Sequence, residues 1–242
     1  MQGRLIYHPR RYAPGALATL PASVVRIEYK TAQGAQTAFL RRGAGVERRF
    51  WVAFSGNGSL ALDWLSVLPS APTVLLVDYP GYGLCEGRPD PESIDANAAG
   101  AVAAARKVAG RPCAVLGYSL GCAAALRLAG AASMERIVLL APFLSMDGMA
   151  RRTLGPLAFV LRHRFDNVSA ICAALAMSPH AQVTVLHGAN DALVPPSMGR
   201  TLAAEWPGAR FEVAPGATHD GLPDACVDRL AALMGPPLTE PR

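Results

Sequence analysis

Short apolar runs recur along the chain, and each is about as long as a β-strand. We predict core strands at residues 50–54, 73–78, 113–116, 136–140, 183–187 and 211–213. The first of these runs is almost wholly apolar, which is typical of a strand buried on both faces of a sheet.

Helix-forming stretches separate most of these strands. They occupy residues 64–68, 91–108, 122–129, 196–206 and 220–233. Alternating strands and helices predict a mainly parallel sheet with helices on both faces. Residues 24–29 and 37–41 flank a turn at residues 33–36, so we expect an N-terminal hairpin that adds an antiparallel edge. The predicted fold class is therefore α/β.

Residues 142–180 interrupt the alternation because they contain no predicted strand and mix prolines, glycines and arginines with amphipathic pieces. We interpret this segment as a short helical cap inserted into a single domain that spans residues 1–242. Its apolar side chains could line a substrate site, but packing of the cap on the core is the stronger interpretation. These residues are Phe143, Leu144, Met146, Leu157, Phe159 and Val160.

Composition narrows the classes of function. Hydrophobic residues make up 51% of the chain and charged residues 17%, which argues for a buried core and against disorder. The formal charge is +5, but the basic residues are scattered and form no long block or basic-aromatic strip. We therefore expect no nucleic-acid partner.

The five cysteines form no C-x-x-C pair and no cluster with histidine at metal-ligand spacing, so we expect no metal and no other cofactor. Reduced cysteines that act as small apolar residues indicate a reducing compartment. Residues 1–21 lack the apolar core of a signal peptide, and no apolar run approaches the ~20 residues that cross a bilayer. We expect a cytoplasmic protein, and the sequence leaves open an anchor ahead of residue 1.

A Gly-x-Ser-x-Gly sequence at residues 117–121 joins a predicted strand to a predicted helix. In this context the pattern is typical of a nucleophile elbow, a tight turn that holds its serine in a strained backbone conformation. Gly117 and Gly121 leave room for the strand and the helix to pack closely. Ser119 is therefore the candidate nucleophile, and the alternative is an ordinary glycine-flanked turn.

A serine hydroxyl is a weak nucleophile and needs a general base, which an acid orients. His219 lies in the loop between the last predicted strand and the last helix, where the base is expected. The other histidines have structural interpretations. His8 belongs to a packed N-terminal arm, His187 to a turn, and His163 and His180 to an exposed cap surface.

Asp191 is the candidate acid, because it follows the strand that ends at His187 and can reach Nδ1 of His219 from a neighbouring loop. The chain order serine, aspartate, histidine accompanies this type of elbow. Asp78, at another strand end, is the second candidate. We expect Asp220 to cap the last helix, and Asp166 to be structural.

The oxyanion formed in such chemistry needs two backbone N–H donors. The residue after the nucleophile, Leu120, supplies one in this type of elbow. We expect the second from residues 55–59, Ser-Gly-Asn-Gly-Ser, and favour the amide of Asn57. The alternative is that this segment is a plain turn between a strand and a helix.

Together with residues 77–83, these motifs resemble the α/β-hydrolase superfamily over most of the chain. The resemblance is closest to the small-cap branch that includes membrane-tethered esterases and protein depalmitoylases. That branch shares the pattern of residues 4–9, a His-Gly-Asn oxyanion loop, and the His-Gly-x-x-Asp-x-x-Val-Pro pattern at residues 187–195. Ser55 departs from the usual histidine of the oxyanion loop, and Cys85 from a usual serine. The first departure changes side-chain support but keeps the backbone donors.

The resemblance implies a cofactor-free serine hydrolase that cleaves carboxylic esters or thioesters through an acyl-enzyme on Ser119. A short cap predicts an open site that takes small acylated molecules, or an acylated chain end presented from a surface. The cap arginines could favour anionic substrates or a membrane surface, but solvated charge is the simpler interpretation. They are Arg151, Arg152, Arg162 and Arg164.

Two alternatives remain at this stage. A serine aminopeptidase or amidase would need a carboxylate in the cap to hold the substrate amine, and the cap is basic rather than acidic. A non-catalytic binding protein on the same fold has no need of a strained elbow with a matching acid and base. Fold alone does not separate these alternatives from an esterase.

Overall fold

The computed structural model describes residues 6–44, 48–149 and 165–235. Within them, one eight-stranded sheet has the order β1-β2-β4-β3-β5-β6-β7-β8. The strands are β1 (Val24–Thr31), β2 (Gly34–Arg41), β3 (Arg49–Phe54), β4 (Val74–Val77), β5 (Arg111–Tyr118), β6 (Arg136–Leu140), β7 (Gln182–Gly188) and β8 (Arg210–Ala214). Strand β2 runs antiparallel to both β1 and β4, and all the other neighbouring strands in the sheet are parallel to each other. The predicted parallel sheet with an antiparallel hairpin is therefore confirmed.

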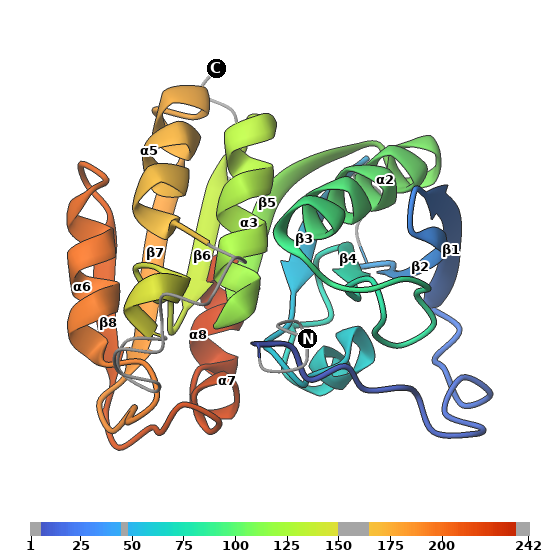
Figure 1. The fold of residues 1–242 in the computed structure, drawn as a ribbon, viewed down its shortest axis with the longest axis horizontal. Helices are drawn as coiled ribbons and strands as arrows, with labels where there is room; N and C mark the ends of the chain where they lie inside the picture. The colour runs from blue at the N-terminus through green and yellow to red at the C-terminus, as the bar shows by residue number, and fades with distance from the viewer. Residues whose placement is uncertain (1–5, 45–47, 150–164, 236–242) are drawn as a thin grey trace.

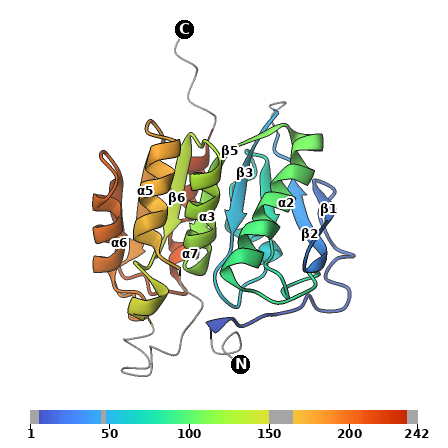
Figure 2. The same cartoon turned by 45° about the horizontal axis from the view of Figure 1, so that its top comes forward.

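Helices cover both faces of the sheet, as Figures 1 and 2 show from two directions. One face carries α2 (Pro91–Ala109), α3 (Leu120–Ala131), α5 (Asn167–Met177) and α6 (Pro196–Ala204). The other carries the 3-10 helix η1 (Ala61–Ser66), α7 (Leu222–Ala225) and α8 (Val227–Met234). None of the helices in the described residues is long and apolar enough to span a membrane.

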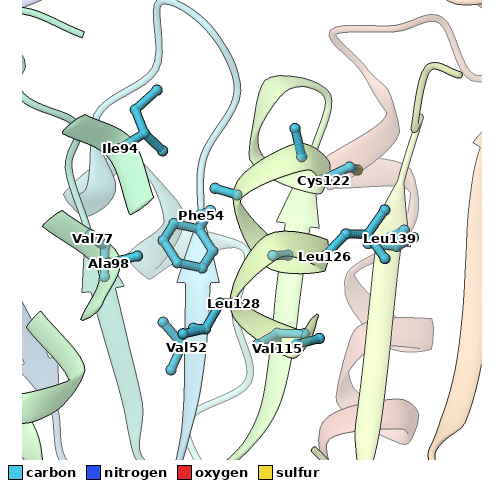
Figure 3. Packing of buried hydrophobic residues seen from close by; sticks show 14 of the residues in the cluster. Val52, Phe54, Val77, Ile94, Ala98, Val115, Cys122, Leu126, Leu128 and Leu139 are labelled. Carbon is cyan, nitrogen blue, oxygen red and sulfur yellow. The ribbon is translucent and has the colours of Figure 1, made fainter. Parts of the chain in front are cut away.

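The alternation of side chains along β3 divides the core into two layers. Phe50, Val52 and Phe54 belong to the cluster under α2 and α3, whereas Trp51 and Ala53 belong to the cluster under η1 and α8. Figure 3 shows Phe54 between the side chains of α2 and those of α3. A strand whose two faces are both covered is buried along its whole length, which explains the unbroken apolar run.

The junction of β5 and α3 leaves no space for side chains at its two glycines. A Cβ atom at Gly117 would collide with the backbone carbonyl oxygen of Gly121, and one at Gly121 would collide with that of Phe54. These contacts hold β3, β5 and the start of α3 together. Ser119 between them has φ 52° and ψ −114°, a strained conformation for a residue with a side chain.

The segment expected to form a cap is partly built into the main body. Helix α5 lies beside α3 in the layer that covers the sheet (Figure 1), and Phe143 is buried in the same cluster as Ile171 of α5. Leu144 and Met146 are partly buried against that cluster, as the packing interpretation expects. The segment that can form a cap is therefore shorter than expected and is limited to the chain between β6 and α5. The predictions for Leu157, Phe159, Val160, His163 and the four cap arginines concern residues outside the described part of the chain.

Two helix predictions differ from the structure. The stretch at residues 64–68, expected to be helical, overlaps the 3-10 helix η1, which begins earlier, at Ala61, and ends at Ser66. The expected last helix is two short helices, and Gly221 rather than Asp220 precedes the first of them. The capping prediction for Asp220 is wrong because Pro223, which fits only in a first turn, makes that helix begin at Leu222.

We predict that Gly117→Ala lowers the free energy of unfolding by about 3 kcal/mol, because the added methyl group meets rigid backbone rather than a movable side chain. Gly208→Ala is the control, since Gly208 has a left-handed φ of 81° but no atom near its Cβ position. Its loss should be only ~1 kcal/mol. Urea denaturation of both variants measures the difference, and equal losses would contradict the account of close packing at the elbow.

Candidate active site

The elbow places Ser119 directly after β5 and at the first turn of α3. Its backbone N–H donates to the carbonyl oxygen of Leu140 over 2.9 Å, which ties the turn to the end of β6. Its carbonyl oxygen accepts from the N–H of Cys122 over 3.0 Å. These two hydrogen bonds fix the backbone of the turn, and Ser119 itself is half-buried, so it remains partly accessible to solvent.

The structure brings Ser119, His219 and Asp191 together. Nε2 of His219 lies 3.0 Å from Oγ of Ser119, and Nδ1 lies 2.7 Å from Oδ2 of Asp191. Because a carboxylate only accepts hydrogen bonds, Nδ1 carries the proton, and Nε2 of the neutral ring is left to accept the serine proton. The arrangement can therefore deprotonate Ser119 and stabilise the imidazolium that results.

Asp191 is held by the turn that follows β7. Its Oδ1 atom accepts from the backbone N–H groups of Leu193 over 3.0 Å and Val194 over 2.8 Å. Burial alone raises the pKa of Asp191, but hydrogen bonds from His187, His219 and Val194 outweigh burial and hold the pKa well below its usual range. The carboxylate is therefore charged at neutral pH and available to orient His219.

His187 contacts this turn in a way that the sequence did not reveal. Its side chain is fully buried, and Nε2 lies 2.8 Å from the carbonyl oxygen of Val194 and 3.5 Å from Oδ2 of Asp191. A carbonyl oxygen only accepts, so Nε2 carries the proton and faces both oxygens. The predicted structural role of His187 is confirmed, and its target is the turn that holds the acid. The short spacing of four residues between His187 and Asp191 is the one feature of the sequence that could have indicated this contact.

Tyr118 supports the site in a way that the sequence did not indicate, because it occupies a variable position of the Gly-x-Ser-x-Gly pattern. Its hydroxyl group donates to the backbone carbonyl oxygen of His219 over 2.9 Å, and the two rings lie 5.2 Å apart. The tyrosine ring also lies against Gly56, where a Cβ atom would approach it to 2.7 Å. One buried ring therefore supports both the histidine loop and the loop after β3.

The loop after β3 places Asn57 and Gly58 close to the elbow, since Gly56 packs on Tyr118. The hydroxyl group of Tyr79 donates to the carbonyl oxygen of Ser55 over 2.5 Å, which fixes the start of the loop. Among the described residues, no protein group accepts a hydrogen bond from the backbone N–H of Asn57 or Leu120. Within this part of the chain, both N–H groups meet the requirement that an oxyanion donor has no protein acceptor.

Asp78, the second candidate acid, has other partners. It accepts from the hydroxyl group of Tyr12 over 2.6 Å and from the N–H of Ala61 over 2.8 Å. Within the described chain it has no hydrogen bond to His219. Burial raises the pKa of Asp78 to about 6, although the bonds from Tyr12 and Ala61 act in the opposite direction. Asp78 therefore joins the N-terminal arm to η1.

The remaining candidates lie apart from this constellation. His8 and His180 are exposed, and Asp166 caps α5 by accepting from the N–H groups of Val168 and Ser169. Across residues 6–44, 48–149 and 165–235, no group of three or more histidine, cysteine, aspartate or glutamate side chains is placed to hold a metal ion.

Sequence comparison relates the chain to a known family and to two proteins of one species. Residues 38–180 match the alpha/beta hydrolase family. Two proteins of Mycobacterium tuberculosis, both described as uncharacterized, are 30% identical to the chain over 236 residues: Rv2307c of strain H37Rv and MT2364 of strain CDC 1551. In each case the match covers 90% of this chain and 80% of the relative.

Solved structures with a similar fold include two esterases. The esterase PF2001 of Pyrococcus furiosus matches with a TM-score of 0.67 at 15% identity, covering 94% of this chain and 97% of its own. The esterase RhEst1 from Rhodococcus sp. ECU1013 matches with a TM-score of 0.58 at 19% identity, covering 88% and 98%. Likeness at this level of identity shows the fold.

We predict that Asp78→Asn changes how stability depends on pH. The folded wild type keeps the proton on Asp78 up to a pKa of about 6, whereas the unfolded chain loses it near pH 4. The folded state therefore binds more protons between these values, and stability falls as the pH rises through them. The variant lacks this titration.

Chemical denaturation at pH 4 and at pH 7 checks the effect. The free energy of unfolding of Asp78→Asn, relative to wild type, should rise by about 2 kcal/mol between the two pH values, because each pKa unit corresponds to about 1.4 kcal/mol and the unfolded carboxyl group is already half-ionised at pH 4. A difference that does not change with pH would show that Asp78 has no raised pKa.

Proposed function

Because the chain belongs to the alpha/beta hydrolase family and has the fold that its motifs predicted, we propose that it is a cofactor-free serine hydrolase. Its substrates are carboxylic esters or thioesters, cleaved through an acyl-enzyme on Ser119. The observation that carries the proposal is the continuous line of hydrogen bonds from Asp191 through His219 to the Ser119 hydroxyl group. Acyl transfer needs a nucleophile, a base and an orienting acid at these distances.

The reaction follows from these positions. Oγ of Ser119 attacks the carbonyl carbon while Nε2 of His219 accepts the hydroxyl proton, and Asp191 stabilises the imidazolium. The backbone N–H groups of Asn57 and Leu120 bind the oxyanion, and His219 then gives the proton to the leaving alcohol or thiol. Water, deprotonated by the same ring, releases the acid from Ser119.

An ester or thioester is favoured over a peptide amine because the segment between β6 and β7 is basic rather than acidic, whereas a substrate amino group needs a carboxylate. Its two acidic residues are Asp147 and Asp166, and Asp166 is already engaged by the N–H groups that open α5 and by the hydroxyl group of Ser169. The four arginines of that segment add positive charge. This charge balance favours an esterase over a serine aminopeptidase.

We place the protein with the small-cap branch of the family on the strength of two loops. These are residues 55–59, which keep Gly-Asn after the departure at Ser55, and residues 187–195, which keep the full His-Gly-x-x-Asp-x-x-Val-Pro pattern. The five cysteines, all free, support a reducing compartment and hence the cytoplasm. We expect the partner to be an acylated small molecule or chain end rather than a nucleic acid.

Labelling with a fluorophosphonate probe tests the nucleophile, because such probes react with activated serines. We predict that wild type is labelled and that Ser119→Ala is not. His180→Ala, which removes an exposed histidine outside the site, should be labelled like wild type. Labelling that persists in Ser119→Ala, or its absence in wild type, would overturn the proposal.

Kinetics on matched substrates test the reaction class. We predict that the wild type hydrolyses p-nitrophenyl esters and not aminoacyl anilides. His219→Ala and Asp191→Asn should each lower kcat by ~10³–10⁴-fold, because the base is lost in one and held in the wrong tautomer in the other. A preference for anilides would show that the protein is an aminopeptidase. Wild-type rates in both variants would show that His219 and Asp191 do not act in the reaction.

A further inference from the structure

The chain ahead of β1 passes directly beside the loop that carries the proposed oxyanion donor. We define residues 6–12 as the N-terminal arm, drawn in dark blue in Figure 1. Ile6 and Tyr7 are buried although they precede the first strand by many residues. The start of the arm is therefore packed as part of the core, whereas residues 8–11 are exposed.

The side chain of Asn57 is the main link between the arm and this loop. Its Nδ2 atom donates to the carbonyl oxygen of Ile6 over 2.6 Å, and its Oδ1 atom accepts from the N–H of His8 over 2.9 Å. The carboxamide thus pairs with the arm backbone as a neighbouring strand would. Asparagine fits because aspartate lacks the donor that Ile6 requires.

Tyr82 completes the link from the opposite direction. Its buried hydroxyl group donates to Oδ1 of Asn57 over 2.8 Å and accepts from the N–H of His8 over 3.0 Å. The His8 N–H, the Asn57 carboxamide and the Tyr82 hydroxyl group, which are far apart in the sequence, are therefore hydrogen-bonded to one another. The loop has little rotational freedom at Asn57 as a result.

The rest of the arm is hydrogen-bonded to the loop that contains Asn57 and to the loop that contains Tyr82. Arg10 donates to the carbonyl oxygen of Gly58 over 3.1 Å, and its own carbonyl oxygen accepts from the N–H of Gly83 over 2.9 Å. Arg11 donates to the carbonyl oxygens of Gly83 and Cys85. By contrast, within the described part of the chain the Ser55 hydroxyl group reaches only the carbonyl oxygen of Ser59, at 3.5 Å, so it adds little support.

We propose that the N-terminal arm and Tyr82 are positioning elements for the oxyanion donor, acting through the side chain of Asn57. The inference rests on the proposed function, because the backbone N–H of Asn57 is the group that would contact the oxyanion. Removing a link should leave Ser119 and His219 in place and tilt this N–H away from the developing charge. Transition-state binding then falls while ground-state binding changes little.

Tyr82→Phe tests the proposal with a matched control. Tyr29→Phe removes the same hydroxyl group from a second tyrosine-asparagine pair, in which Tyr29 donates to Oδ1 of Asn97 over 2.8 Å away from the triad. With p-nitrophenyl butyrate we expect Tyr82→Phe to lower kcat about 10-fold with KM within about twofold, less than the ~10²–10³-fold loss of a whole donor. Tyr29→Phe should retain the wild-type kcat.

A trifluoromethyl ketone with a matching acyl chain provides the second readout, because its adduct on serine carries an oxyanion. Its inhibition constant should rise by the same factor as kcat/KM falls in Tyr82→Phe, which a general loss of stability would not produce. Fluorophosphonate labelling of Ser119 in the variant confirms that the nucleophile is intact.

His8→Pro and His8→Ala form an independent pair, since the exposed His8 side chain is lost in both and its backbone N–H only in the first. We expect the kinetic signature of Tyr82→Phe in His8→Pro and wild-type behaviour in His8→Ala. Wild-type kinetics in Tyr82→Phe and His8→Pro would overturn the positioning role and leave the proposed function standing. A wild type without Ser119-dependent hydrolysis would overturn both.

Discussion

The left-handed backbone at Ser119 is the constraint on which the rest of the site depends. A residue with a side chain adopts φ 52° only where its surroundings force it. Here the force comes from Gly117 and Gly121, whose missing Cβ atoms let β3, β5 and α3 approach to backbone contact. The bond from the Ser119 N–H to Leu140 fixes the remaining side of the turn. The elbow is thus a product of core packing and not of the five-residue motif alone.

Three loops meet this elbow, and each is held by a polar side chain, which is buried in two of the loops and half-buried in the third. Tyr118 binds the backbone of His219, His187 binds the turn of Asp191, and the Asn57 carboxamide binds the N-terminal arm. The bonds of Tyr118 and His187 are strengthened by burial, because water does not compete for them. They fix groups that come from distant parts of the chain, which is the condition for acyl transfer without movement of the catalytic groups.

The meeting of Ser119, Asp191 and His219 could be predicted from the sequence because each follows a strand, and the carboxyl ends of parallel strands meet at one edge. Their supports could not, since a side chain such as Tyr118 or His187 meets its partner only through tertiary packing. The arm shows the same limit. Nothing in its sequence indicates that Ile6 and His8 would bind the carboxamide of Asn57.

The central claim is that an acyl group passes through Ser119, and mass spectrometry of acid-quenched turnover tests it most directly. During hydrolysis of a p-nitrophenyl ester, the peptide that contains Ser119 should gain the mass of the acyl group, and the gain should appear and decay at rates that account for turnover. Hydrolysis without an acylated Ser119 peptide, or with the acyl group on another residue such as Cys122, would contradict the account.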